Sequence, residues 1–156
     1  MLRTIRRPGP QLQPRDIQAL ERRFGATLPS EYAAFLLRSN GGRPEPDCFP
    51  VQDWREGGPI DDAHWLQVLL PEPVGADDIL WTLDVMKGRL PPHLLPIGST
   101  GGGDLICLWL EGPARGSVVL WDHEAEHKPP TTKNVHAVAP DFATFLALLQ
   151  DPPAYE

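Results

Sequence analysis

Two apolar segments near the middle of the chain, residues 105–110 and 117–121, most constrain how it can fold. A short segment that contains Gly and Pro separates them. Alternate residues of a strand point to opposite faces of a sheet. The first segment would then present two faces, Leu105, Cys107 and Trp109 on one and Ile106, Leu108 and Leu110 on the other. Because both faces are apolar, the sequence predicts a hairpin at the centre of a sheet that is covered on both sides.

Charged residues stand at the ends of these two strands. Asp104 precedes the first strand, and Asp122, His123 and Glu124 follow the second. We expect a functional site at these ends. The glycines at residues 101–103 lead into a strand, whereas phosphate-binding loops place their glycines at the N-terminus of a helix. They therefore indicate a tight loop or bulge and not a nucleotide site.

Apolar residues at helical spacing predict four helices around the sheet. They begin at Pro14, Leu28, Asp77 or Asp78, and Pro140, and end at Gly25, Asn40, Gly88 and Asp151. Further strands are expected at residues 65–70 and 135–138. Helices at both ends of the chain with strands between them indicate an α+β fold. We predict a single domain with a central, mainly antiparallel sheet, on which helices from the N- and C-terminal parts pack.

The composition is that of an ordinary folded domain. The chain has 156 residues, of which 41% are hydrophobic and 22% charged, enough for one domain with a buried core. A net charge of −7 argues against a nucleic-acid partner. Two cysteines cannot make a disulfide framework, and no secretory signal or membrane-spanning run is recognisable. We therefore expect a cytoplasmic protein that binds neither nucleic acid nor membrane.

Residues 1–13 are expected to form a loose arm, residues 14–150 the domain, and residues 151–156 a tail. Residues 43–64 are rich in proline and acid and too long for a simple connector, so they form either a short hairpin or a functional loop. A tryptophan among acids, Trp54, suits an interface with a basic protein. A loop tryptophan that folds back onto its own core is the alternative.

The sequence His123-Glu124-Ala125-Glu126-His127 spells H-E-x-x-H, the zinc protease signature. That chemistry requires a helix, which places both histidines on one face. Here a strand runs directly into the segment and two prolines follow it, and a residue before proline is disfavoured in helical geometry. The match is therefore interpreted as coincidental, and no catalytic residue, metal or cofactor is expected; incidental metal binding by His123 and His127 is left open.

Three blocks of sequence, taken together, carry a family resemblance. The first is Ile17-x-x-Leu20-Glu21, Phe24-Gly25, Leu28-Pro29-x-x-Tyr32-x-x-Phe35-Leu36 and Asn40-Gly41-Gly42; the second is Leu95-Pro96-Ile97, Gly101-Gly102-Gly103-Asp104 and Trp121-Asp122-His123-Glu124; the third is Val138-Ala139-x-x-Phe142-x-x-Phe145-Leu146. In this order and spacing they resemble the SUKH superfamily of Smi/Knr-like domains. The resemblance implies a single α+β domain without known catalytic residues. It also implies a bacterial immunity protein that neutralises a polymorphic toxin, often a nuclease.

The resulting hypothesis is a protein-binding module that is not an enzyme: an immunity protein that occludes a cognate, basic toxin. Its candidate partner-binding residues are Asp47, Asp53, Trp54, Glu56, Asp61, Asp62, Asp104, Asp122 and Glu124. Two alternatives remain open, a metal-dependent hydrolase that uses His123, Glu124 and His127, and a regulatory scaffold protein.

Overall fold

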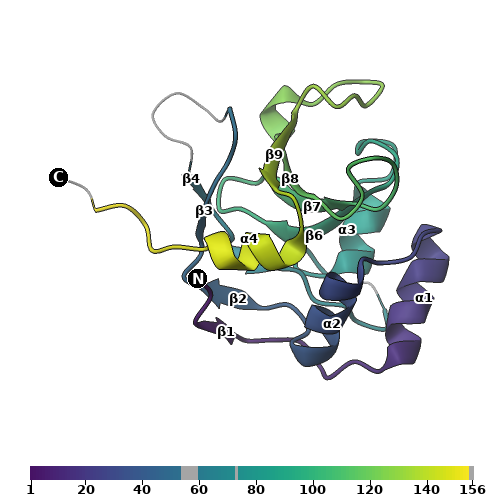
Figure 1. Ribbon diagram of the computed structural model, residues 1–156. Coiled ribbons are helices and arrows are strands. Elements are labelled where there is room, and N and C mark those ends of the chain that lie inside the picture. Colours follow the sequence, from purple (N-terminus) through teal and green to yellow (C-terminus); the bar gives the residue numbers. More distant parts are fainter. Residues whose placement is uncertain (54–59, 73, 155–156) are drawn as a thin grey trace.

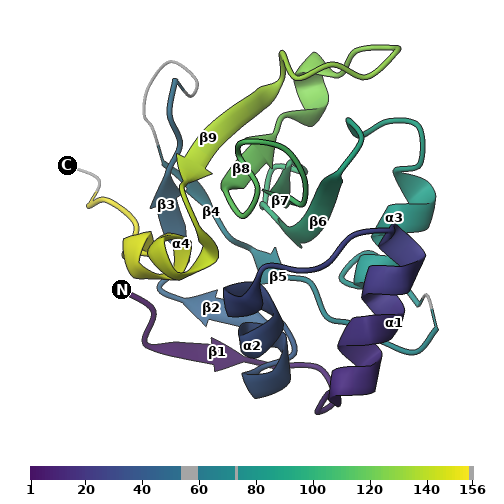
Figure 2. The same ribbon diagram turned by 45° about the vertical axis from the view of Figure 1, so that its right-hand side comes forward.

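A five-stranded antiparallel sheet forms the centre of the molecule. The computed structural model describes residues 1–53, 60–72 and 74–154. The strands lie in the order of the sequence: β5 (Trp65–Leu66), β6 (Leu94–Ser99), β7 (Leu105–Trp109), β8 (Val118–Trp121) and β9 (Val135–Ala139). The predicted central hairpin is β7–β8, with Leu105 opposite Trp121 and Leu108 opposite Val118. The α+β class and the antiparallel sheet are confirmed (Figures 1 and 2).

The two faces of β7 are buried in two different clusters, as the alternation predicts. Ile106 and Leu108 belong to the main core, together with Val118 and Leu120 of β8. Leu105, Cys107 and Trp109 lie in or against a smaller cluster on the other side, which also contains Met86, Leu94, Val119 and Trp121. Packing on both faces buries apolar surface on each side of the hairpin, which stabilises the centre of the sheet by about 25 cal/mol per Å².

Buried residues of all four helices join the main core. The helices are α1 (Pro14–Phe24), α2 (Ser30–Arg38), α3 (Ile79–Val85) and α4 (Phe142–Leu148). Tyr32 and Phe35 of α2 meet Phe142 of α4 with ring centroids 5.1 and 5.0 Å apart. Aromatic packing therefore holds together helices from opposite ends of the chain. Edge contacts between the rings stabilise the pair beyond what the burial of apolar area contributes.

Local chemistry sets the helix ends where the sequence indicated. Gly25 closes α1 in the left-handed conformation at φ 89°, a conformation that glycine adopts without a Cβ penalty. Of the two candidate caps for α3, Asp77 and Asp78, the cap is Asp78, whose carboxylate accepts the Leu80 N–H. Asp141 caps α4 by accepting the Thr144 N–H at 2.7 Å. The two aspartates each satisfy a backbone donor that has no partner within its helix, and the Gly25 N–H satisfies the carbonyl of Glu21 at the C-terminal end of α1.

The prediction of a loose arm over residues 1–13 is wrong for its central part. Thr4–Arg6 forms strand β1, which pairs with β2 (Arg43–Glu45), and Ile5 packs against the main core. Leu12 is also buried. The segment is ordered because β2 offers it a partner strand and the core offers a place for Ile5, and both partners are distant in the sequence.

Two further differences concern residues 43–70. The described part of 43–64 forms β2 and a second pair, β3 (Cys48–Pro50) with β4 (Ile60–Asp62), so the short hairpin is the correct alternative there. The strand expected at 65–70 ends at Leu66. Beyond it the backbone turns towards α3, because the Val68 N–H bonds to the carbonyl of Asp77 rather than to β6.

No helix among the described residues has the length and hydropathy to cross a membrane.

Candidate functional site

The start of β7 and the end of β8 place Asp104 and Asp122 at the same end of the sheet. The strands are antiparallel and Leu105 lies opposite Trp121, so the residue before one and the residue after the other are neighbours. The loop between β6 and β7 is a tight turn closed by the Thr100 N–H, which donates to the Asp104 carbonyl at 3.0 Å. Gly103 in this turn has φ 96°, a backbone conformation that glycine adopts without the steric cost of a Cβ atom.

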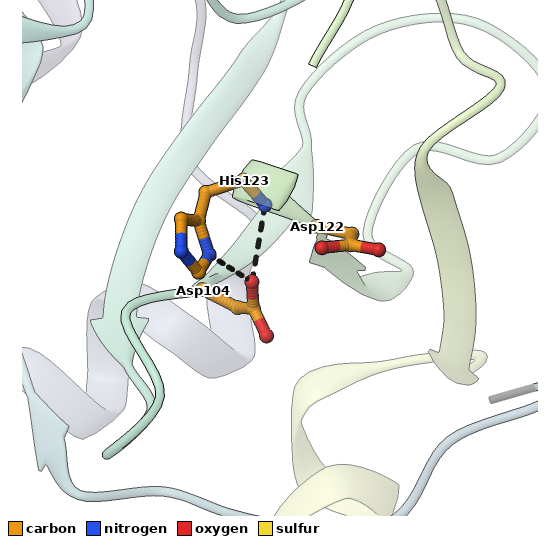
Figure 3. A group of neighbouring side chains, drawn as sticks. All are labelled: Asp104, Asp122 and His123. Atoms are coloured by element: carbon orange, nitrogen blue, oxygen red, sulfur yellow. Dashed lines mark hydrogen bonds and ion pairs between the residues drawn. The ribbon is translucent and has the colours of Figure 1, made fainter. Parts of the chain in front are cut away.

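Asp104 is buried and holds His123 in place. Its Oδ1 accepts the backbone N–H of His123 at 3.0 Å and contacts the imidazole Nδ1 at 2.5 Å (Figure 3). The side chain of Asp104 is 1% exposed, whereas that of His123 is 36% exposed. A buried carboxylate requires such charge-assisted partners, because desolvation otherwise penalises its ionised form. The imidazole therefore has a fixed orientation with one edge open to solvent.

Asp122 shapes the chain as it leaves the sheet. Its carboxylate accepts the Glu124 N–H at 3.0 Å and caps a short 3₁₀ turn, η1 (His123–Ala125). Its backbone carbonyl accepts the Asn134 side-chain amide at 2.9 Å. Asn134 is buried, and its role had no signal in the sequence. The turn is thus supported from two sides, and it directs His123 back over Asp104.

Asp61 and Asp62 of β4 extend the acidic end of the sheet. The carboxylate of Asp62 accepts the Gly101 N–H at 3.0 Å, which ties β4 to the loop before β7. Burial raises the pKa of Asp61 to about 6; the hydrogen bond from the Asp62 N–H lowers it, and repulsion from Asp62 and Asp104 adds to the increase. The mutual repulsion indicates that these carboxyls share one surface region.

The predicted partner-binding residues therefore divide into groups. Asp61, Asp62, Asp104 and Asp122 come together with His123, and Glu124 lies exposed next to them. Asp47 lines a separate hollow with Arg3 and Asp151. Asp53 is exposed at a turn with φ 54°. Trp54 and Glu56 lie outside the described residues.

The geometry that a zinc protease motif requires is not formed by residues 123–127. The 3₁₀ turn ends at Ala125, and Glu126 is extended at φ −61° and ψ 138°. Glu126 instead pairs with Arg89 at 2.8 Å, an ion pair that lowers the pKa of its carboxyl. His127 is exposed. The motif is therefore a coincidence of sequence, as its context predicted.

Among the described residues, one group of three side chains has the composition of a metal site. The ligand atoms of Asp104, Asp122 and His123 all lie within 4.8 Å of one another. In the view of Figure 3, the carboxylate of Asp104 lies between the imidazole and the carboxylate of Asp122. His123 belongs to this group through its contact with Asp104, not through the H-E-x-x-H spacing.

Comparison with known proteins places the chain in a family. The sequence profile of the SMI1 / KNR4 family (SUKH-1) matches residues 11–148. A relative in Bacillus subtilis (strain 168), described as SPbeta prophage-derived uncharacterized protein YokK, is 27% identical over 148 residues. The similarity covers 88% of this chain and 74% of the relative. The profile match spans the four helices as well as the acidic end of the sheet.

Proposed function

The chain belongs to the SMI1 / KNR4 family (SUKH-1), and from this premise we propose that it is an immunity protein that binds a cognate toxin and occludes its working surface. The observation that carries the proposal is the family match over residues 11–148, because SUKH domains act in bacteria as binding partners of toxins. The mechanism is steric and electrostatic, and it requires no chemical step by the immunity protein.

The acidic end of the sheet supports a basic partner. Asp61, Asp62 and Asp122 are half-buried, and Glu124 is exposed, within a chain of net charge −7. Complementary charge steers association and selects the partner more than it raises affinity. Hydrogen bonds to Gly101 and to the η1 turn fix the carboxylates of Asp62 and Asp122, so little side-chain entropy remains to be lost on binding.

A hydrolase using His123, Glu124 and His127 is less well supported than a binding module. The residues lack the helical turn that would align them. A groove of about 330 Å³ lies between α1 and residues 69–71, and its lining contains none of the three. A regulatory scaffold has no structural feature in its favour among the described residues.

Co-expression with any toxin encoded in a neighbouring gene tests the proposal. We expect the full chain to restore growth of cells that produce the toxin, and to form a complex that survives gel filtration. Absence of both rescue and complex, with the chain folded and expressed, would overturn it.

A pair of matched double variants tests whether the acidic end of the sheet binds the toxin. Asp62→Asn with Glu124→Gln removes two charges from the acidic end, while Asn keeps the acceptor for Gly101. Glu72→Gln with Glu111→Gln removes two charges elsewhere, Glu111 lying in the turn at the opposite end of the β7–β8 hairpin. We expect the first pair to slow association with the toxin about tenfold at low salt and the second to leave it within about twofold. Equal effects of both pairs would exclude this face.

A further inference from the structure

We propose that Asp104, Asp122 and His123 form a binding site for a first-row divalent cation such as Zn²⁺ or Mn²⁺. This inference is independent of toxin binding and of the H-E-x-x-H motif. It rests on the donor chemistry and on the geometry at the end of β7 and β8.

The donor set is mixed, which distinguishes it from a surface patch of acids. Two carboxylates and one imidazole are ligands that Zn²⁺ and Mn²⁺ accept, whereas Mg²⁺ and Ca²⁺ prefer oxygen alone. The three ligand atoms lie within 4.8 Å of one another. Ligand atoms of a tetrahedral zinc site, each at about 2.1 Å from the ion, are about 3.4 Å apart. The Asp104–His123 pair at 2.5 Å must therefore open by about 1 Å, and ligand atoms up to 4.8 Å apart must close by about 1.4 Å, to share one coordination shell.

The Asp104–His123 contact identifies the position that the cation would take. Nδ1 of His123 and Oδ1 of Asp104 are 2.5 Å apart, so an imidazole nitrogen and a buried carboxylate oxygen already face one another. A divalent cation bound beside them would take the lone pair of Nδ1 in the tautomer that carries its hydrogen on Nε2. It would also supply the buried carboxylate with a counter-charge.

The surrounding backbone supports the ligands. Asp122 accepts the Glu124 N–H through Oδ1, and this bond holds its carboxylate at the end of β8. Gly103 stands over the imidazole without a side chain, and a Cβ there would lie 3.4 Å from Cε1 of His123. The capped η1 turn fixes the backbone that carries two of the three ligands, as the outer shell of a metal site does.

Metal titration of the chelator-treated full chain tests the site. We expect isothermal calorimetry to show about one equivalent of Zn²⁺ or Mn²⁺ bound, with Mg²⁺ unable to compete at equal concentration. His123→Gln and Asp122→Asn should each weaken binding by at least about tenfold. Both variants keep hydrogen-bonding groups at these positions, so their melting temperatures without metal serve as the folding check.

His127→Gln is the matched control, because it removes an exposed imidazole four residues along the chain. We expect it to bind the metal within about twofold of the wild-type chain. If His127→Gln is the only variant that weakens metal binding, the metal is held by His127 and not by His123, and the proposal is overturned. Equal binding by all variants, tighter binding of Mg²⁺, or no binding by the wild-type chain would also overturn it.

Discussion

At the scale of single residues, the buried Asp104 carboxylate is the least replaceable group of the candidate site. It accepts two hydrogen bonds from His123, and it lies at the start of the central strand with its side chain 1% exposed. The acidic residues around it are a different kind of feature, because they are half-buried or exposed and solvent screens their charges. The stability of the site and its recognition of a partner are therefore carried by different residues.

We predict that Asp104→Ala destabilises the chain by about 2 kcal/mol, because it leaves the His123 N–H without an acceptor and empties a buried position. Asp104→Asn keeps an acceptor oxygen and should recover part of the loss. Asp84→Ala, which breaks an exposed ion pair with Arg23, should cost less than about 1 kcal/mol. Guanidinium unfolding curves measure all three, and equal losses for Asp104→Ala and Asp84→Ala would contradict the assignment.

Asp61 gives a prediction about pH. Its pKa is raised from 3.8 to about 6 in the folded chain, chiefly by burial. The folded state therefore holds this proton more tightly than the unfolded state does. The contribution of Asp61 to stability is complete below the unfolded pKa and is lost as the pH rises through about 6.

Asp61→Asn should consequently gain stability relative to the wild-type chain between pH 4 and pH 7. Unfolding free energies across that range measure the difference. Asp53→Asn, which removes an exposed carboxyl, is the matched control. Parallel curves for Asp61→Asn and the wild-type chain would show that Asp61 titrates at an ordinary pKa.

At the scale of elements, short helices depend on their caps more than on their own propensity. Helix α3 has seven residues, too few to be stable alone in water. It is held by its packing on the core and by Asp78, whose carboxylate accepts both the Leu80 N–H at 2.9 Å and the Val74 N–H at 2.8 Å. The cap therefore also orders the chain that precedes the helix.

We predict that Asp78→Ala costs about 1–2 kcal/mol, since it leaves two backbone donors without their acceptor. Asp77→Ala at the adjacent exposed position should change stability by less than about 0.5 kcal/mol. Thermal and denaturant unfolding of the two variants distinguish the candidate caps that the sequence left open. A larger loss in Asp77→Ala would reverse the assignment.

At the scale of the whole molecule, a few close approaches of backbone join parts that are distant in sequence. Gly42 pairs with Leu66, which connects the β1–β2 pair to the main sheet. Gly41 lies against the same segment, where a Cβ would come within 2.4 Å of the Gln67 carbonyl. The chain after α2 therefore fits against β5 only with glycine at this point.

A matched pair of glycine variants tests this contact. Gly25 and Gly41 both have positive φ, at 89° and 63°, but a Cβ on Gly25 would meet nothing within 4 Å. Gly25→Ala should cost about 1 kcal/mol through backbone strain alone. Gly41→Ala should cost more than about 3 kcal/mol, because strain and a backbone clash combine. Similar losses in unfolding experiments would show that the segment moves to accept the methyl group.

The sequence by itself determined the features whose cause is local. Alternation in residues 105–110 assigned each side chain of β7 to the correct cluster, and helical spacing found the buried residues of α2. Pro14 and Gly25 marked the two ends of α1 and Asp141 the start of α4, whereas α4 ends at Leu148, before the predicted end at Asp151. These signals can be read in one dimension because neighbouring residues of one element make them.

Only the tertiary structure decided the features whose partners lie far along the chain. Asp104 and His123 are 19 residues apart, and Gly101 and Asp62 are 39 apart, yet each pair is joined by a hydrogen bond. The same is true of β1, which is ordered by a strand that begins at Arg43. A hydrogen bond between distant residues leaves no periodic signal in the sequence, so the folded sheet alone determines which acids meet and which histidine they hold.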